Sequence, residues 1–365
     1  YLSISGSSVG DILQLDRFAG ELYGHLNLPS AQWLSTLLGH SFNANGKFDF
    51  WYQSNSLEPN IEVSLDLSDL IWTPQDGRIF KLDNLTFDAG VNVQPAGWIG
   101  RLQSLAISAA DTGFTLDRFQ IESRSDTLQF KTQAMDVGDL AATVVASGLL
   151  SSKVSTIFSE LGPSGSVLAL EAELANWRQP LSDWSLMAQV QDISLQARKK
   201  APGLLGLDGT VLASQMGAKA WINTRNFTLD LPTVYRKPIE FTQVLGQLSA
   251  SWDANTLYLH QGIFEGEHEE HHARALFGMA IPLVPNAAQG PPLAMYLDVG
   301  VPEASVDVRQ NYIPYRIPDV LEEWLESSIL GGGLSETSFS WRGGFKGFGS
   351  GLQSLQIATV ISDGS

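Results

Sequence analysis

The stretch Ile61-Glu62-Val63-Ser64-Leu65-Asp66-Leu67 alternates strictly between apolar and polar side chains. Because successive side chains of a β-strand point to opposite faces, this period of two predicts a strand with one apolar face and one polar face. The same alternation recurs at Trp184–Val190, Phe227–Leu231, Leu257–Ile263 and Met295–Val299. The sequence therefore predicts a mainly β protein.

Turn signals separate these runs. Gly, Asn, Asp and Pro cluster at Pro74–Gly77, Leu207–Gly209 and Asp253–Asn255, and such residues favour tight turns between antiparallel neighbours. On this basis we expect an antiparallel arrangement of roughly 14 strands.

Helical patterns fall at three places, Pro29–Gly39, Leu140–Gly162 and Pro318–Leu330. Each is followed closely by glycine and a strand-like run, which indicates a module of one helix plus several antiparallel strands. We expect residues 1–45 to be the end of a preceding module with a short helix. Residues 46–164 and 165–332 would be two modules that each end in a helical segment, and residues 333–365 the start of the next module.

The alternation alone leaves the architecture open. Two sheets could bury their apolar faces against each other in a sandwich, or one sheet could close into a barrel. A third arrangement is one long sheet folded lengthwise into a trough that its apolar face lines. The three short helices are too few to cover so many strands.

Composition excludes several classes of function. The chain has 365 residues, with 22 Lys and Arg against 39 Asp and Glu, and a net charge of −17. Such a surface repels phosphate backbones, so nucleic-acid binding is not expected. Because the chain has no Cys, it can form neither disulfides nor thiolate metal sites. It also lacks a run of about 20 apolar residues that would span a membrane.

Several short motifs occur in an order that points to a known family. Glu160–Val167 contains the joint Leu161-Gly162-Pro163-Ser164-Gly165, and Ala201–Gly209 contains a Pro-Gly turn. The run Leu245–Trp252 follows, and then Asn311–Pro314 precedes Trp324–Gly332. Together with Leu28-Pro29 and Gly46–Trp51, these segments resemble the YhdP branch of the AsmA-like bacterial envelope proteins, which are related to TamB.

This resemblance implies a fold and a function. The fold is a long antiparallel sheet curled into an open, taco-shaped apolar groove, with a few short helices between modules. The function is that of a periplasmic segment of a bridge-like protein that carries phospholipid between the inner and outer membranes. The resemblance further implies no catalytic residues, no metal and no cofactor, and it implies anchoring to the inner membrane by a segment that is not present here. The expected partners are phospholipid acyl chains, with both membranes contacted through parts outside this chain.

The residues expected to line the groove are the apolar members of the alternating runs. They are Ile61, Val63, Leu65, Leu67, Trp184, Leu186, Val190, Phe227, Leu229, Leu231, Leu257, Leu259, Met295, Leu297 and Val299.

Two other functions remain open at the level of sequence. A closed β-sandwich with a structural or adhesive role in the envelope would show the same alternation. A remote alternative is a zinc hydrolase, because His268-Glu269-Glu270-His271-His272 matches H-E-x-x-H. On a helix, His268 and His272 would share a face and bind zinc, with Glu269 as general base.

One basic cluster, Arg198-Lys199-Lys200, precedes Pro202. Its position in a turn predicts a solvated loop, which could also touch a lipid headgroup.

Overall fold

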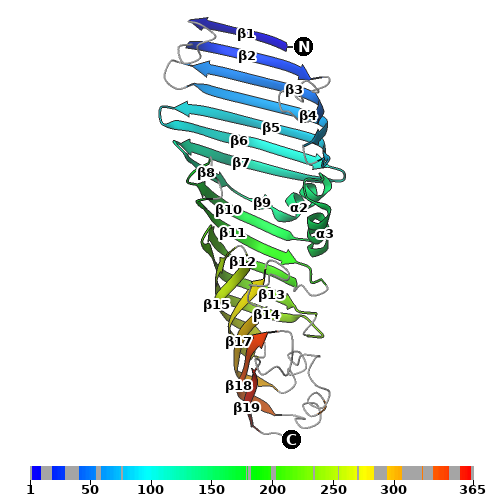
Figure 1. The fold of residues 1–365 in the computed structure, drawn as a ribbon, viewed down its shortest axis with the longest axis vertical. Helices are drawn as coiled ribbons and strands as arrows, with labels where there is room; N and C mark the ends of the chain where they lie inside the picture. The colour runs from blue at the N-terminus through cyan, green and yellow to red at the C-terminus, as the bar shows by residue number, and fades with distance from the viewer. Residues whose placement is uncertain are drawn as a thin grey trace. The chain divides into compact units, whose positions relative to one another are not determined.

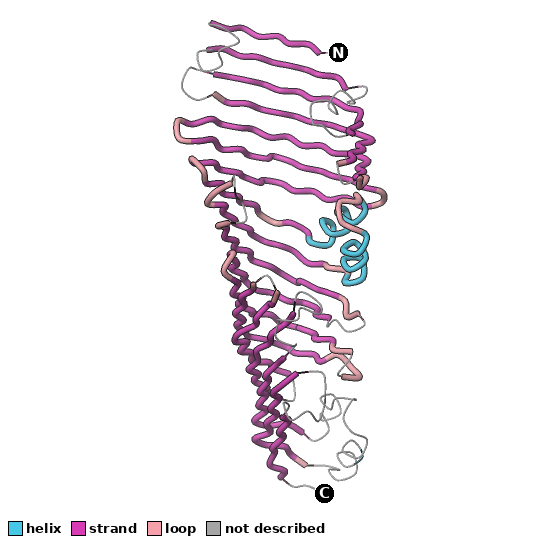
Figure 2. The backbone as a smooth tube through the Cα atoms, in the orientation of Figure 1, coloured by secondary structure: helices cyan, strands magenta, loops and turns pink. Residues whose placement is uncertain are grey.

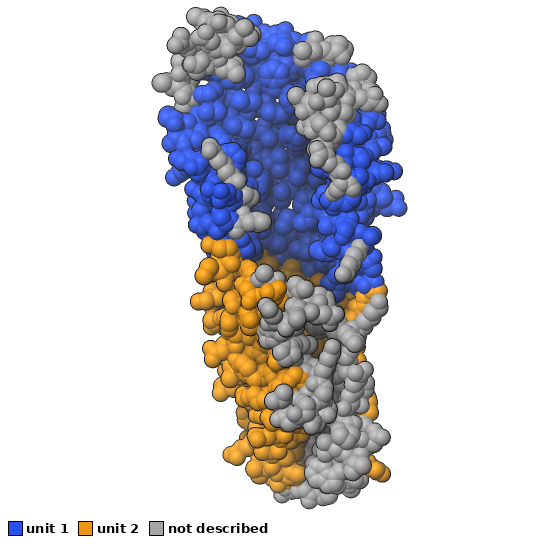
Figure 3. All heavy atoms as spheres, in the orientation of Figure 1, with its two compact units in different colours: residues 1–188 blue, residues 189–365 orange. Residues whose placement is uncertain are grey.

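The computed structural model describes most of the chain as strands (Figures 1 and 2). The described residues are 2–9, 19–28, 41–54, 59–74, 77–177, 179, 182–198, 203–232, 235–253, 255–268, 271–282, 294–305, 323, 332–344 and 354–362. They divide into two compact units, residues 1–188 (unit 1) and 189–365 (unit 2), which Figure 3 colours separately.

Unit 1 holds the first ten strands. They are β1 (Leu2–Val9), β2 (Ala19–Leu28), β3 (Ser41–Ser54), β4 (Asn60–Thr73), β5 (Phe80–Gln94), β6 (Gly97–Ala109), β7 (Thr112–Arg124), β8 (Thr127–Thr132), β9 (Met135–Asp136) and β10 (Ser164–Leu174). From β1 to β8 each strand pairs antiparallel with the next, and β10 pairs with both β8 and β9.

β11 (Trp184–Leu195) begins in unit 1 and ends in unit 2. Unit 2 continues with β12 (Gly203–Ser214), β13 (Gly217–Asp230), β14 (Ile239–Trp252), β15 (Thr256–His268), β16 (His271–Pro282), β17 (Ala294–Ser305), β18 (Gly333–Gly344) and β19 (Ser354–Ser362). From β12 to β19 every strand pairs antiparallel with its neighbour in sequence.

The expected fold class is confirmed. The described strands form one long antiparallel sheet that is not closed into a barrel. A sandwich of two sheets is therefore the wrong architecture. The expected strand count was too low, because the described residues alone contain 19 strands.

Bulges within the strands explain why counting apolar–polar alternations gives too few strands. Asp69 in β4, Arg118 in β7 and Asn226 in β13 have positive φ values of 52°, 58° and 56°, a conformation that is uncommon outside glycine. The β3–β4 register shifts by one residue beside Asp69, between Asn43 and Asn45. A bulge bends its strand and adds an unpaired residue, so it both curves the sheet and interrupts the apolar–polar alternation.

A core cluster lies on both sides of the bulge at Asp69. Leu67, Leu70 and Leu82 are buried there, and Leu65 precedes the bulge while Trp72 follows it. Since residues from the two arms of the bent strand pack on each other, the face that carries Leu65 and Leu67 is the inside of the bend.

Two helices follow β9 in unit 1. α2 (Val137–Ala146) and α3 (Ser152–Leu161) are separate, so the expectation of one helical segment over Leu140–Gly162 needs correction. Gly148, with φ of 78°, lies in the turn that ends α2, a conformation that favours glycine. The other two expected helices, Pro29–Gly39 and Pro318–Leu330, lie outside the described residues apart from Glu323, which is helical.

Cap contacts differ between the helices. The Asp136 side chain accepts a hydrogen bond from the backbone N–H of Asp139 at 2.7 Å and caps α2, whereas Ser151 makes no side-chain cap at α3. The backbone oxygen of Ser147 accepts a hydrogen bond from the Lys81 N–H at 2.8 Å, which ties the end of α2 to β5.

The four modules expected from the helix-to-strand joints stay a prediction, because the two units are defined by packing and not by repeated joints.

Candidate functional site: an apolar face on the inside of the bend

Directly opposed residues of paired strands lie on the same face of a sheet, so the register identifies the rows that cross unit 1. One row runs through Leu26, Phe48, Leu65, Phe87, Leu105 and Leu116, on β2 to β7. A parallel row runs through Gly24, Phe50, Val63, Ala89, Leu102 and Phe119. We call these two rows the unit 1 apolar face.

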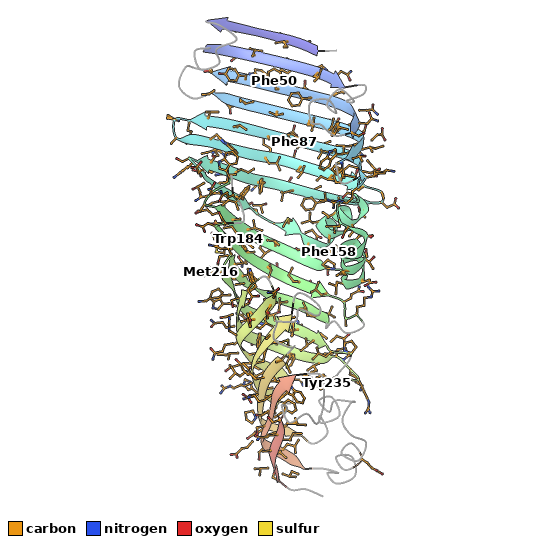
Figure 4. The ribbon with its side chains drawn as sticks, in the orientation of Figure 1. Phe50, Phe87, Phe158, Trp184, Met216 and Tyr235 are labelled. Carbon is orange, nitrogen blue, oxygen red and sulfur yellow. The ribbon has the colours of Figure 1, made fainter. Side chains whose placement is uncertain are left out.

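No residue of the unit 1 apolar face is charged. Phe48, Leu65, Phe87 and Leu105 are half-buried, so this face stays partly accessible. Figure 3 shows unit 1 hollowed on the side turned to the viewer, and Figure 4 places Phe50 and Phe87 among the side chains over its strands. The arrangement offers a long uncharged surface to an apolar ligand.

The opposite face of unit 1 carries polar and charged side chains. Glu62, Ser64 and Asp66 are exposed there. On the same face, His25 Nδ1 lies 2.6 Å from Asp49 Oδ1, and the Tyr23 hydroxyl donates to that oxygen at 2.7 Å. These contacts, with His25 first and Tyr23 second, hold the pKa of the Asp49 carboxyl below its usual value.

Unit 2 also has two uncharged rows across its strands, built from different residues. One row runs through Leu248, Gly262, Phe277, Leu297, Trp341 and Leu355. The next runs through Gly246, Phe264, Ala275, Val299, Phe339 and Ile357. We call these rows the unit 2 apolar face, and none of its residues is charged.

Aromatic rings cover glycines on the unit 2 apolar face. A Cβ atom built on Gly246 would lie 2.3 Å from the Phe264 ring, and one on Gly262 would lie 2.5 Å from the Phe277 ring. Gly266 is covered in the same way by Phe241, at 2.7 Å. A missing Cβ lets each ring lie close to the neighbouring backbone, so glycine at these positions serves close packing.

The predicted lining residues fall on several strands. Ile61, Val63, Leu65 and Leu67 lie on β4, and Trp184, Leu186 and Val190 on β11. Phe227 and Leu229 lie on β13, Leu257 and Leu259 on β15, and Met295, Leu297 and Val299 on β17, while Leu231 follows β13. Whether these side chains contact a lipid stays a prediction.

The register brings some of these residues together. Leu259 and Met295 both lie opposite Met279 of β16, and Leu229 lies between Leu204 and Ile239. Sequence reasoning missed Phe48, Phe87, Phe277 and Trp341, although each lies directly opposite a predicted residue or its partner. These four aromatic residues lie in short alternating runs of their own, and those runs could have identified them.

The zinc hydrolase alternative, which requires the H-E-x-x-H motif to lie on a helix, is wrong. His268 ends β15 and His272 lies in β16, so the motif crosses a hairpin instead of following a helix. The register pairs His268 with His271 and Glu267 with His272, which places His268 and His272 on opposite faces. Glu269 lies outside the described residues, and the part of the chain that is described contains no cluster of three metal-ligand side chains.

An open antiparallel sheet with an uncharged apolar face on the inside of its bend defines a groove-type protein. A comparison with protein families matches the YhdP protein family over residues 3–365, and the chain belongs to that family. It is a family of bacterial envelope proteins of a non-enzymatic, transport type associated with lipid.

No curated protein and no solved structure matches the chain. Among the described residues, none of the helices has the length and apolar character needed to cross a lipid bilayer.

Proposed function

We propose that the chain is a periplasmic segment of a bridge-like protein that carries phospholipid between the inner and outer membranes. The observation that carries the proposal is the uncharged, half-accessible apolar face on the inside of the bend. Membership of the YhdP family supports an envelope setting for this transport. Attachment to the inner membrane through a further segment belongs to the same proposal.

The energetics favour such a surface. Exposing an acyl chain to water costs about 0.8 kcal/mol per CH₂, so a 16-carbon chain faces on the order of 12 kcal/mol. An uncharged apolar face removes much of this cost, while the headgroup stays in water at the open side. This role requires neither a nucleophile nor a metal from the chain.

Two adjacent residues of β5 provide the test. Phe87 belongs to the unit 1 apolar face, and Asp88 is exposed on the polar face, where its Oδ2 accepts a hydrogen bond from Ser104 Oγ at 3.0 Å. A photo-crosslinking amino acid placed at position 87 should form phospholipid adducts in cells, detected by mass spectrometry. The same amino acid at position 88 is the matched control.

Adducts at position 87 and not at position 88 would support the proposal. Equal adducts at both positions, or none at either in a folded protein, would overturn it. Mass spectrometry of organic extracts from the detergent-free chain provides an independent measurement, and bound phospholipid near one-to-one or above is the expected result.

A further inference from the structure

Helix α3 carries an apolar stripe that is open to solvent. Val154, Ile157 and Phe158 are between 37% and 44% exposed. Because residues three and four apart lie on the same side of a helix, these three side chains form one continuous stripe. The opposite side of α3 is made of serine and threonine, and Thr156 and Ser159 are exposed there. Apolar side chains gathered in one exposed stripe are typical of a surface that meets a ligand.

The stability of α3 depends on packing. A helix of ten residues is marginal by itself, and most helical stability in proteins comes from packing of the apolar side. Ser151 forms no side-chain cap at the start of α3, and the helix packs against α2. A ligand that covers the stripe would therefore supply apolar packing to α3.

α2 places α3 beside the unit 1 apolar face. α2 packs on β7 and β10. On β7, Phe114 and Leu116 are buried, whereas Thr115 and Asp117, which point to the other face, are exposed. Because Leu116 belongs to the unit 1 apolar face, α2 covers this face where its rows reach β7, and α3 lies at its margin. Figure 4 shows Phe158 near the ends of the unit 1 strands, where Figure 1 labels α2 and α3.

Two more apolar side chains extend the stripe toward β5. Leu149, in the turn before α3, and Ile79, just before β5, are both exposed. The two segments are held together, because Arg78 Nη1 donates a hydrogen bond to the Leu149 oxygen at 2.8 Å. The Ile79 oxygen also lies 2.6 Å from the position of a Cβ atom on Gly148. Exposed apolar surface therefore extends from α3 toward the strand that carries Phe87.

The composition of α3 disfavours two other ligands. Helices that lie on membrane surfaces are rich in Lys and Arg on their polar side, whereas α3 has one Lys and one Glu in a chain with a net charge of −17. A second copy of the chain is also disfavoured. Stable interfaces use roughly 20–30 residues a side, and the stripe offers three.

We propose that the apolar stripe of α3 contacts the acyl chain of a lipid that lies on the unit 1 apolar face, so that the helix forms one wall of the binding site. This inference rests on the proposed function and adds to it where the acyl chain is enclosed. A narrow, uncharged chain can be covered by three side chains, and moving its CH₂ groups out of water is favourable.

Single-cysteine labelling tests this contact, because the chain has no Cys of its own. An environment-sensitive fluorophore is attached at position 158 in the stripe, or at position 159, which is exposed on the other side of α3. A third label, at position 87, reports on the unit 1 apolar face. Each labelled chain takes up phosphatidylcholine with a doxyl quencher on its acyl chain and is then separated from the vesicles. A thermal melt confirms that each chain is folded.

We expect the acyl quencher to quench the labels at positions 87 and 158, and to quench the label at position 159 much less. Quenching at position 87 alone would overturn the inference and leave the proposed function standing. Quenching at none of the three positions would remove the proposed function and this inference with it.

The other ligands give different results in the same experiment. Quenching at position 158 only while vesicles are present would mean that α3 docks on a membrane surface, and it would overturn the inference. A fluorescence change at position 158 that follows protein concentration without lipid would show that a second copy covers the stripe, with the same consequence.

Two double variants measure how much the stripe contributes. I157Q/F158Q removes two apolar side chains and keeps a good helix former at both positions. T156Q/S159Q introduces the same residues on the opposite side of α3 and is the matched control. Because all four positions are exposed, neither variant should change the melting of the lipid-free chain appreciably.

We expect I157Q/F158Q to shorten the residence time of bound phosphatidylcholine by roughly three- to tenfold. T156Q/S159Q should leave the residence time close to that of the unaltered chain. Equal residence times for the two variants would contradict the contact between the stripe and the acyl chain.

Discussion

The rings of Phe264 and Phe277 stack on the unit 2 apolar face, with their centroids 5.6 Å apart and their planes 16° from parallel. Both rings lie over the position that Gly262 leaves free, because a Cβ there would come within 2.5 Å of Phe277 and 2.9 Å of Phe264. The pair therefore depends on a residue that contributes no side chain.

Replacing Gly262 with valine should displace both rings. Overpacking of this kind typically costs about 1–3 kcal/mol of unfolding free energy, measured as a lower urea midpoint. Gly300→Ala is the control, because a Cβ at Gly300 meets nothing within 4 Å. An unchanged midpoint for Gly262→Val would show that the rings do not need the glycine.

Adjacent residues on opposite faces should respond differently to the same charge. Phe264 belongs to the apolar face, and Ile263 is 53% exposed on the other. Phe264→Lys should cost about 3 kcal/mol or more, whereas Ile263→Lys should stay within about 0.5 kcal/mol. Thermal melts of both variants measure this difference, and similar losses would contradict the assignment of faces.

The two helix N-termini offer a comparison of caps. Asp136→Ala removes the side-chain bond to Asp139 and should lower stability by about 1 kcal/mol. Ser151→Ala removes no side-chain cap bond from α3, so its effect should be a few tenths of a kcal/mol at most. Amide hydrogen exchange in α2 and α3 measures both, and equal effects would contradict a capping role for Asp136.

Asp49 should make stability sensitive to acid. Its pKa is lowered below 3.8 in the folded chain, so its contribution is fully present above pH 3.8 and is lost as the pH falls through the lowered value. Asp49→Asn should therefore be less stable than the unaltered chain at neutral pH, and the two should converge in strong acid. Chemical denaturation across this range measures the gap.

Asp66→Asn is the matched control for that titration, because it removes an exposed carboxylate from the same face of the sheet. A constant gap between Asp49→Asn and the unaltered chain at all pH values would show that the contacts with His25 and Tyr23 do not favour the ionised carboxylate in the fold.

Sequence reasoning is most accurate for stretches of strand that contain no bulge. Ile61–Leu67 is read correctly because the β4 bulge at Asp69 comes only after it. In β7, Leu116 and Phe119 lie in adjacent apolar rows although they are three residues apart, because Arg118 between them adopts a positive φ. An apolar–polar alternation with a period of two cannot reveal this three-residue spacing between adjacent rows.

The candidate site was harder to predict than the fold. Single runs such as Met295–Val299 show which side chains share a face, but the neighbours of Leu297 are Phe277 and Trp341, which lie far away in the sequence. Only the register joins these residues into rows. The helical segment was found but not its break, because a turn at Gly148 leaves the apolar pattern on both sides intact.

Because each strand from β12 to β19 pairs with its neighbours in the chain, a hairpin is the smallest piece that evolution can insert or delete without reversing the strands that follow. Each such event would lengthen or shorten the lined surface by about 10 Å. Loss of the single bulge residue Glu336 would be more severe, because it would turn Phe339 and Trp341 to the polar face relative to the start of β18. This fold therefore permits the insertion or deletion of whole hairpins. It does not permit the insertion or deletion of single residues within strands.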